Sequence, residues 1–282
     1  MKILIRLALI ALSFFILKTG HAASYPFDIQ ISGKGKQAIV FIPGFACSGK
    51  VWDDTKAVFE KDFTCYTLTM PGFAGVPASA DPSFHNWELA IANFIKDKKL
   101  DHPIVIGHSM GGGLALALAA DYPQSIGKIV VVDVLPCLAA LRNPAFQSKE
   151  NNDCSPVVKQ MTSMPDSQFH AMQVMTMTQL MADSTKRASA VDWSMKSDRK
   201  TFATMFCDFS NTDLREKIKS IQCPALILLE PQFVLIGGIA QQYQNMPTAQ
   251  LKYASKGLHF IQYDDKEWYL QQLSDFLQPT KK

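Results

Sequence analysis

The sequence predicts an α/β fold in which helices cover both faces of a mostly parallel central sheet, with a helical cap inserted between two strands. Short, continuous apolar runs alternate with helical patterns along most of the chain, which is typical of a parallel sheet buried on both faces. The alternation stops between residues 136 and 211, where β-branched runs are rare. A Gly-x-Ser-x-Gly motif also lies between an apolar run and a stretch of small residues. These features favour one large α/β domain with an insertion.

Each core element corresponds to a short segment of its own. Strands are expected at runs rich in apolar and β-branched residues: Gln37–Ile42, Cys65–Thr69, Ile104–Ile106, Ile129–Val132, Ala225–Leu229 and Leu251–Tyr253. Helices are expected between them: Val51–Glu60, Asn86–Lys98, Gly112–Asp121, Leu214–Ile221, Ile239–Asn245 and Lys266–Leu277. Residues 136–211 hold six of the twelve methionines between Met161 and Met181, and are expected to form the cap. Residues 23–135 and 212–282 then form the core.

Residues 1–22 have the pattern of a secretory signal peptide. Lys2 and Arg6 precede an apolar run from Leu7 to Leu17 that is too short to span a membrane. Gly20-His21-Ala22 then supplies small residues for cleavage. We therefore expect an exported protein, periplasmic or secreted, with no stable membrane anchor after cleavage.

The charge balance argues against a nucleic-acid partner. The formal net charge is +3, and Lys2, Arg6 and Lys18 of the leader account for it. The mature chain is therefore about neutral, without the basic surface that nucleic acid requires. No pair of cysteines has the spacing of a metal site, so we expect no metal and no cofactor.

All six cysteines lie in the mature part of the chain, which makes disulfides plausible in an exported protein. Two pairings would anchor the ends of the cap: Cys137 with Cys154 at its start, and Cys207 with Cys223 at its exit. The alternative is that the cysteines are buried free thiols.

Ser109 is the candidate nucleophile. It lies at the centre of the motif Gly107-His108-Ser109-Met110-Gly111, directly after the apolar run Pro103–Ile106. This spacing indicates a nucleophile elbow, a sharp turn from strand to helix that exposes the serine hydroxyl at the helix N-terminus. Glycines are expected on both sides because the backbone is crowded there and a Cβ atom would clash. The alternative is an ordinary glycine-rich turn.

Four motifs resemble those of the α/β-hydrolase family, in the order in which that family has them. They are Val40–Phe45, Met70–Gly75, the serine motif, and Gly257–Phe260 followed by an amphipathic helix. The resemblance covers nearly all of the mature sequence. It implies an α/β-hydrolase fold and an activity of the serine esterase type.

The resemblance also implies that His259 is the general base, since the family places its base in the loop after the last strand. A serine hydroxyl becomes nucleophilic when an imidazole can accept its proton. His108 adjoins Ser109, but elbow geometry turns its side chain away, so we expect it to be a packing or pocket-wall residue. The alternative for His259 is a structural histidine with no part in catalysis.

The acid of the triad departs from the commonest family pattern. The resemblance would place an aspartate after the strand Ala225–Leu229, at the position that holds Phe233 here. Asp133, at the end of the strand Ile129–Val132, resembles the acid position of haloalkane dehalogenases and some lipases. We expect Asp133 to orient His259. Glu230 is the alternative acid, and a further alternative is that no acid operates.

The same resemblance places the oxyanion hole at two backbone N–H groups. Carried over to this chain, they belong to Phe45 and Met110. The cap methionines, together with Phe169, Leu180, Trp193 and Phe206, are expected either to line an adaptable apolar pocket or to pack the cap onto the core.

These features predict an exported serine hydrolase. The expected reaction is hydrolysis of a small to medium, mainly apolar carboxylic ester through a Ser109–His259–Asp133 triad and an acyl-enzyme. The expected partner is thus a small-molecule acyl substrate. One alternative is hydrolysis of another acyl bond: an amide, a thioester, a lactone or a carbon–carbon bond. Another is a binding protein of the hydrolase fold without turnover, which the missing aspartate at Phe233 would suggest.

Overall fold

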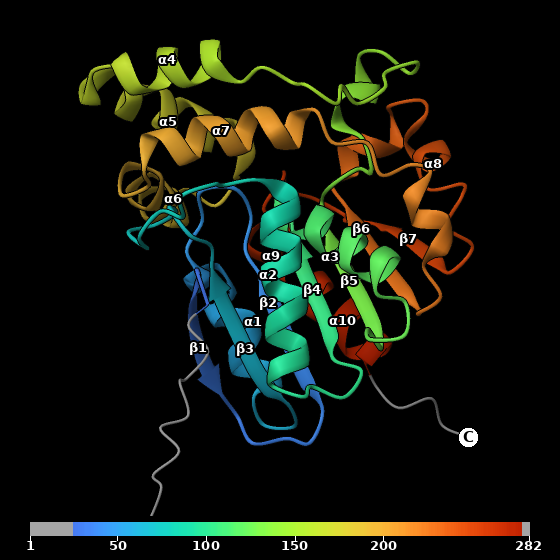
Figure 1. Ribbon diagram of the computed structural model, residues 1–282. Helices are drawn as coiled ribbons and strands as arrows, with labels where there is room; N and C mark the ends of the chain where they lie inside the picture. Colours follow the sequence, from blue (N-terminus) through green and yellow to red (C-terminus); the bar gives the residue numbers. More distant parts are fainter. Residues whose placement is uncertain (1–24, 278–282) are drawn as a thin grey trace, which may run out of the picture.

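The computed structural model describes residues 25–277, so the expected signal peptide lies outside the described residues. Its centre is a sheet in the order β1-β3-β2-β4-β5-β6-β7, in which β1 pairs antiparallel with β3 and all other neighbours are parallel (Figure 1). The strands are β1 (Asp28–Ser32), β2 (Ala38–Ile42), β3 (Thr64–Thr69), β4 (Ile104–His108), β5 (Lys128–Val132), β6 (Ala225–Leu229) and β7 (Ala249–Tyr253). The predicted α/β fold with a mostly parallel sheet is confirmed.

Helices cover both faces of this sheet. The helices of the described residues, those of the cap included, are α1 (Asp53–Phe59), α2 (Phe84–Asp97), α3 (Met110–Asp121), α4 (Ser155–Ser163), α5 (Asp166–Leu180), α6 (Ser184–Met195), α7 (Arg199–Ser210), α8 (Ile239–Gln242), α9 (Ile261–Asp264) and α10 (Lys266–Leu277). Short 3₁₀ turns are η1 (Gly49–Trp52), η2 (Leu138–Leu141), η3 (Lys217–Ser220) and η4 (Pro231–Val234).

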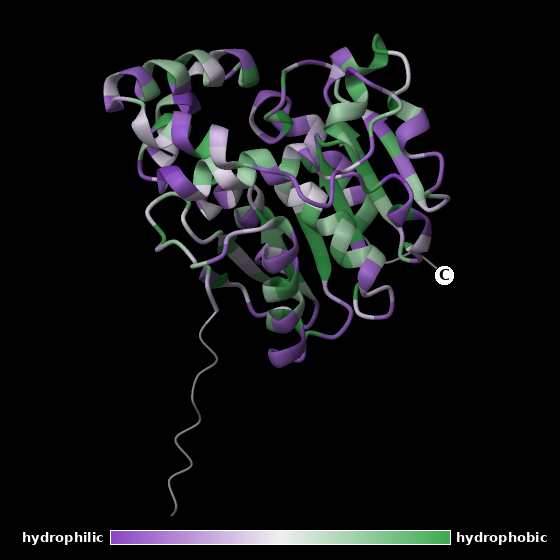
Figure 2. Cartoon of the chain, turned by 45° about the horizontal axis from the view of Figure 1, so that its top comes forward, coloured by the Kyte–Doolittle hydropathy of each residue, from purple (hydrophilic) through white to green (hydrophobic). Residues whose placement is uncertain are grey.

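Alternate residues of the central strands enter two separate cores. Val105 of β4 and Val131 of β5 belong to the core beneath α2 and α3, whereas Ile106 and Val132 belong to the core beneath α1 and α10. This follows from the two-residue period of a strand, which sends successive side chains to opposite faces. Figure 2 shows the resulting green, hydrophobic strands enclosed by purple, more hydrophilic outer elements. Side-chain packing on both faces of the sheet therefore fixes the register of the central strands.

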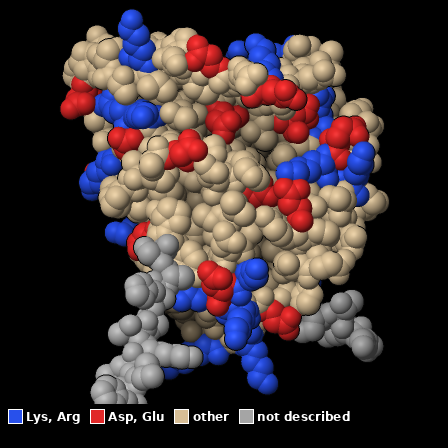
Figure 3. Space-filling view, in the orientation of Figure 1, with Lys and Arg blue, Asp and Glu red and all other residues tan. Residues whose placement is uncertain are grey.

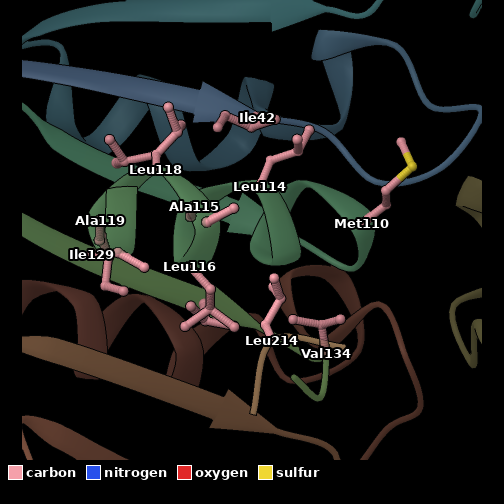
Figure 4. Close-up of a cluster of buried hydrophobic side chains, with 14 of the residues drawn as sticks. Ile42, Met110, Leu114, Ala115, Leu116, Leu118, Ala119, Ile129, Val134 and Leu214 are labelled. Carbon is pink, nitrogen blue, oxygen red and sulfur yellow. The ribbon is translucent and has the colours of Figure 1, made fainter. Parts of the chain in front are cut away.

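The helix that follows the serine is apolar on every side. Residues 110–120 of α3 are all buried. Figure 4 shows Leu114 on the side of Ile42 and Leu116 on the side of Leu214. A helix buried all round is fixed by packing in every direction. The N-terminus of α3, where Ser109 lies, is therefore held rigidly.

Helices α4–α7 lie between β5 and β6 in the chain and form a layer above the sheet in Figure 1. Backbone contacts join this layer to the core: Asp198 N–H donates to the Gly72 carbonyl (2.8 Å), and Ala74 N–H donates to Ser197 Oγ (3.0 Å). Gly72 has φ +78°, and a Cβ there would collide with the Thr201 side chain. The cap thus rests closely on the Met70–Gly75 motif.

Some local expectations were wrong. Strand β1 was not expected, and the helix expected over Leu214–Ile221 is only the 3₁₀ turn η3. Leu214 N–H donates to the Pro136 carbonyl (2.9 Å), which ties this segment to the chain at the start of the cap rather than to a preceding helical turn. The expected helix Ile239–Asn245 is shorter and ends at Gln242.

The expected disulfide pairings were also wrong. The one disulfide within residues 25–277 joins Cys154 to Cys207 and so links the start of α4 to α7 inside the cap. Cys137 and Cys223 are buried free thiols, as are Cys47 and Cys65. Cys137 lies in the core, where its N–H donates to Gln242 Oε1 (3.0 Å), away from the partner that we expected.

We predict that thiol titration of the denatured, unreduced protein finds four free thiols, those of the buried cysteines. The bridge closes a long loop, with a sequence separation of 53 residues. Cys154→Ser should therefore lower the free energy of unfolding by about 2–4 kcal/mol, measured by denaturant titration. Six titratable thiols in protein isolated from an oxidising compartment would contradict the disulfide.

Candidate active site

Ser109 occupies a strained turn between β4 and α3. Its φ is +53° and its ψ is −125°, a conformation that is rare for a residue with a side chain. A Cβ at Gly107 would collide with the Gly111 carbonyl, and a Cβ at Gly111 would collide with the Ile42 carbonyl. Both glycines are therefore required for this turn to form. The turn has the geometry of a nucleophile elbow.

The adjacent strand ends in a second strained residue, Asp133. Its φ is also +53°, its side chain is fully buried, and it directly follows β5. Ser109 N–H donates to the Val132 carbonyl (2.8 Å), which places the ends of β4 and β5 side by side. The two residues therefore lie at the same edge of the sheet, as expected for neighbouring parallel strands.

His259 is hydrogen-bonded to Asp133. The distance from His259 Nδ1 to Asp133 Oδ2 is 2.7 Å, although the two residues are 126 positions apart. The other oxygen, Oδ1, accepts from Glu230 N–H (2.7 Å). Because a carboxylate only accepts hydrogen bonds, His259 carries its proton on Nδ1 and leaves Nε2 free to accept another. The Asp133 carboxylate is thus fixed at both oxygens.

His108 is in contact with His259, which the sequence did not indicate. Its Nε2 lies 3.0 Å from the His259 carbonyl oxygen, and the two ring centroids are 4.7 Å apart. A carbonyl accepts only, so His108 Nε2 carries the proton. Burial lowers the pKa of His108 well below its usual value, so the ring is neutral. His108 therefore holds the backbone of His259 in addition to packing.

The first motif lies against the elbow. A Cβ at Gly44 would lie 3.3 Å from Ser109 Cβ and 2.7 Å from His108 Nδ1, so only glycine fits there. Among the hydrogen bonds of residues 25–277, none uses the N–H of Phe45 or of Met110. Both donors come from segments that meet at Ser109. They are free to bind an oxygen atom that develops negative charge beside it.

Glu230 lies beside the pair without joining it. In the described part of the chain its carboxylate makes no hydrogen bond; only its backbone N–H reaches Asp133. Burial, and then the nearby charge of Asp133, raise the pKa of Glu230 to about 7. Phe233, at the position expected for the more common acid, lies in η4 and packs against the core.

The arrangement can support nucleophilic catalysis. The Ser109 hydroxyl, the His259 imidazole oriented by Asp133, and two free N–H donors meet at the carboxyl ends of the strands, beneath the cap. Within residues 25–277 no hydrogen bond joins the Ser109 hydroxyl to His259; catalytic hydrogen bonds are often long before substrate binds. A cavity of about 800 Å³ lies at the other end of the strands, near their amino ends, where Phe63 and Ile104 are among the lining residues. None of the candidate residues lines it.

A sequence model of the family described as alpha/beta hydrolase fold matches residues 37–266. The chain belongs to the α/β-hydrolase family. Since the match runs from β2 to the start of α10, it includes every candidate site residue. The curated relatives of this α/β-hydrolase include an esterase and a deformylase, which supports hydrolase activity.

Two relatives and one solved structure illustrate the likeness. The α/β-hydrolase is 24% identical over 203 residues to pimeloyl-[acyl-carrier protein] methyl ester esterase of Wigglesworthia glossinidia brevipalpis, covering 71% of this chain and 76% of the relative. It is 22% identical over 254 residues to N-formylmaleamate deformylase of Pseudomonas putida, covering 88% and 91%. The enol-lactonase from Burkholderia xenovorans superposes with a TM-score of 0.74 at 16% identity, covering 89% and 96%. At that identity the structural likeness shows the fold alone.

Two further properties of this α/β-hydrolase concern residues 25–277. None of the helices there has the length and apolar character that a membrane crossing requires. The same residues contain no group of three or more His, Cys, Asp or Glu side chains suited to hold a metal ion. On the face shown in Figure 3, basic and acidic side chains are interspersed.

Proposed function

We propose that this protein is an exported serine esterase that hydrolyses small to medium, mainly apolar carboxylic esters through Ser109, His259 and Asp133. The observation that carries the proposal is the 2.7 Å hydrogen bond between His259 and Asp133, made at the edge of the sheet that also presents Ser109. It orients an imidazole with a free Nε2, which a serine nucleophile requires.

The reaction proceeds in two halves. Ser109 Oγ attacks the ester carbonyl carbon while its proton passes to His259 Nε2, and the oxyanion accepts from the N–H groups of Phe45 and Met110. His259 then returns the proton to the leaving alcohol, which leaves an acyl group on Ser109. A water molecule repeats the attack, with His259 as base, and releases the acid and free serine. Asp133 stabilises the imidazolium in both halves.

The apolar surroundings of Phe45 favour an apolar ester. Its ring packs edge-on against Phe73, Phe202 and Phe206, with centroid distances of 5.1, 4.5 and 5.9 Å. Phe206, from α7 of the cap, is 52% exposed. An exposed aromatic side chain next to an oxyanion donor provides a surface for a substrate chain.

The cap methionines divide between the two roles expected for them. Met177 and Met181 are buried against the core, which supports packing. Met161, Met164 and Met172 are only partly buried, near the cluster of Phe169 and Phe202. The second group is therefore the one that we propose to contact substrate.

Export is proposed from the leader pattern of residues 1–22 together with the Cys154–Cys207 disulfide, because disulfides persist mainly in oxidising compartments. The partner is then a small acyl molecule met outside the cytoplasm. We propose no nucleic-acid partner and no membrane anchor after leader cleavage.

The proposal is tested with p-nitrophenyl esters of increasing acyl length, matched anilides and simple lactones. We expect kcat/KM to be highest for the esters and to rise with acyl length before it falls, because the cap limits chain size. Faster turnover of lactones or anilides would favour one of the alternative acyl bonds. These substrates are included because the similar proteins comprise an enol-lactonase and a deformylase. Failure of the wild-type protein to react with a fluorophosphonate would indicate a binding protein instead.

A further inference from the structure

The backbone around His259 is held at three consecutive residues. Leu258 N–H donates to Asp264 Oδ2 (2.9 Å), and the His259 carbonyl accepts from His108 Nε2 (3.0 Å). Phe260 N–H donates to the carbonyl of Leu180, the last residue of α5 in the cap (3.2 Å). The position of the imidazole therefore depends on one core side chain, one α9 carboxylate and one cap carbonyl.

The Asp264 carboxylate also binds the cap. Its Oδ2 accepts from Ala182 N–H (3.0 Å), and its Oδ1 accepts from Asp183 N–H (2.8 Å). Ala182 and Asp183 form the short turn between α5 and α6. One carboxylate thus joins three backbone donors, two from the cap and one next to His259. Hydrogen bonds to an ionised acceptor are roughly twice as strong as neutral ones.

The surroundings leave this junction little room to adjust. A Cβ at Gly257, which has φ +95°, would collide with Asp264 Cβ. Met181, which precedes Ala182 at the start of the cap turn, is fully buried in the same core cluster as Phe260. Arg187 holds the turn from the other side, through hydrogen bonds to the Met181 carbonyl (2.8 Å) and the Ala182 carbonyl (3.2 Å). The turn and the loop of residues 256–260 around His259, the histidine loop, are therefore packed as one unit.

We propose that Asp264 is a positioning residue that couples the placement of the cap to the placement of His259. This rests on the proposed function only in that His259 is the base. When the turn at residues 180–183 is docked, Asp264 and Leu180 fix the loop on both sides of His259. When the turn moves, Phe260 N–H loses its acceptor. Asp264 loses the two cap donors that fix the carboxylate to which Leu258 N–H is bonded, so the His259 loop is less firmly held and the imidazole can move away from Ser109. A substrate that displaces the cap thereby changes the geometry of the base.

The test compares Asp264→Asn with Asp265→Asn as a matched control. Asparagine at 264 keeps the size but replaces one acceptor oxygen with an amide NH₂, which faces backbone donors. Asp265 is the next residue, and its carboxylate accepts from Ser255 N–H (2.9 Å) and Ser255 Oγ (2.6 Å) and makes no hydrogen bond to the cap. It thus tests the loss of a carboxylate next to the histidine loop without loss of the cap contact.

Two measurements are needed: kcat on a short acetate ester, and hydrogen exchange of the amides in residues 180–183 and 255–260. We expect Asp264→Asn to lower kcat by about tenfold to a hundredfold, as a displacement near 1 Å would. KM for this short ester should change little. Exchange should rise together in both segments, whereas in Asp265→Asn it should rise only around Ser255 and the histidine loop.

The proposal is overturned if Asp264→Asn keeps wild-type kcat, or if it loses activity while the cap turn exchanges as slowly as before. Should Asp264→Asn not fold, Asp264→Glu keeps two acceptor oxygens but moves them outward, and the same joint rise in exchange is expected. Absence of that joint rise would overturn the proposal. The exchange measurement needs no turnover, so it tests the coupling independently of activity. The esterase proposal is tested separately, by the reaction of the wild-type protein with a fluorophosphonate.

Discussion

Ser109→Ala is expected to lower kcat on an activated ester by about 10⁴-fold or more while the fold stays intact. The substitution removes only the hydroxyl oxygen, so the acyl-enzyme can no longer form. Alanine has the same Cβ as serine and adds no new clash to the turn at φ +53°. The oxyanion donors and His259 stay in place, which leaves a small residual rate. Steady-state kinetics and a thermal melt measure the two parts of this expectation.

Ser125→Ala is the matched control, because Ser125 is exposed in the turn after the other end of α3. It should retain wild-type kcat. A fluorophosphonate should label wild type and Ser125→Ala on the peptide that contains Ser109, and should leave Ser109→Ala unlabelled. Turnover that persists in Ser109→Ala, or a label that maps to another peptide, would remove Ser109 from the role of nucleophile.

Most strands of the core could be predicted from the sequence, because buried parallel strands are continuous apolar runs. Ala225–Leu229 was placed to the residue, and β2, β4 and β5 to within a few residues. Strand β1 was missed because its sequence, Asp-Ile-Gln-Ile-Ser, alternates and is largely exposed at an antiparallel edge. The turn η3 was taken for a longer helix because its apolar spacing is helical, although the Leu214 backbone bonds to Pro136.

The candidate site was predictable where one segment determines the geometry. The elbow around Ser109 follows from its glycines and from the flanking strand and helix, all local in sequence. The contact of His108 with His259 spans 151 positions, and that of Asp264 with Asp183 spans 81. Nothing in the separate segments indicates such pairs. A disulfide was expected and is present, but the two expected pairings were wrong for the same reason, since pairing depends on how the cap helices lie side by side.

Asp133→Asn is expected to preserve the fold and to lower kcat by up to about 10⁴-fold. The asparagine oxygen can still accept from Glu230 N–H, which keeps the strand ends together. Its NH₂ group then faces His259 Nδ1 and favours the ring tautomer with the proton on Nε2. That tautomer cannot accept the Ser109 proton. Steady-state kinetics, together with a thermal melt, would show the loss of rate without loss of structure.

Glu230→Gln is the matched comparison and should have a different signature. Its side chain makes no hydrogen bond to His259 within the described residues, and its backbone N–H is unchanged, so kcat should change far less than in Asp133→Asn. Its pKa, raised from 4.5 to about 7, means that the folded state holds this proton more tightly than the unfolded state does. The stability it contributes is complete below pH 4.5 and is lost as the pH rises through 7. Glutamine has no proton to lose, so the variant should gain Tm relative to wild type above pH 7 and not at acid pH.

The two variants together decide which carboxylate serves His259. If Asp133 is the acid, Asp133→Asn lowers kcat strongly, whereas Glu230→Gln keeps most of its kcat and gains Tm above pH 7. The opposite order of kinetic loss would transfer the role to Glu230, whose carboxyl would then have to reach the imidazole by a rearrangement of η4. If neither variant lost activity, Ser109 and His259 would operate without a carboxylate. The 2.7 Å hydrogen bond to a fully buried Asp133 favours the first result, because that carboxylate has no solvent to replace the imidazole as a partner.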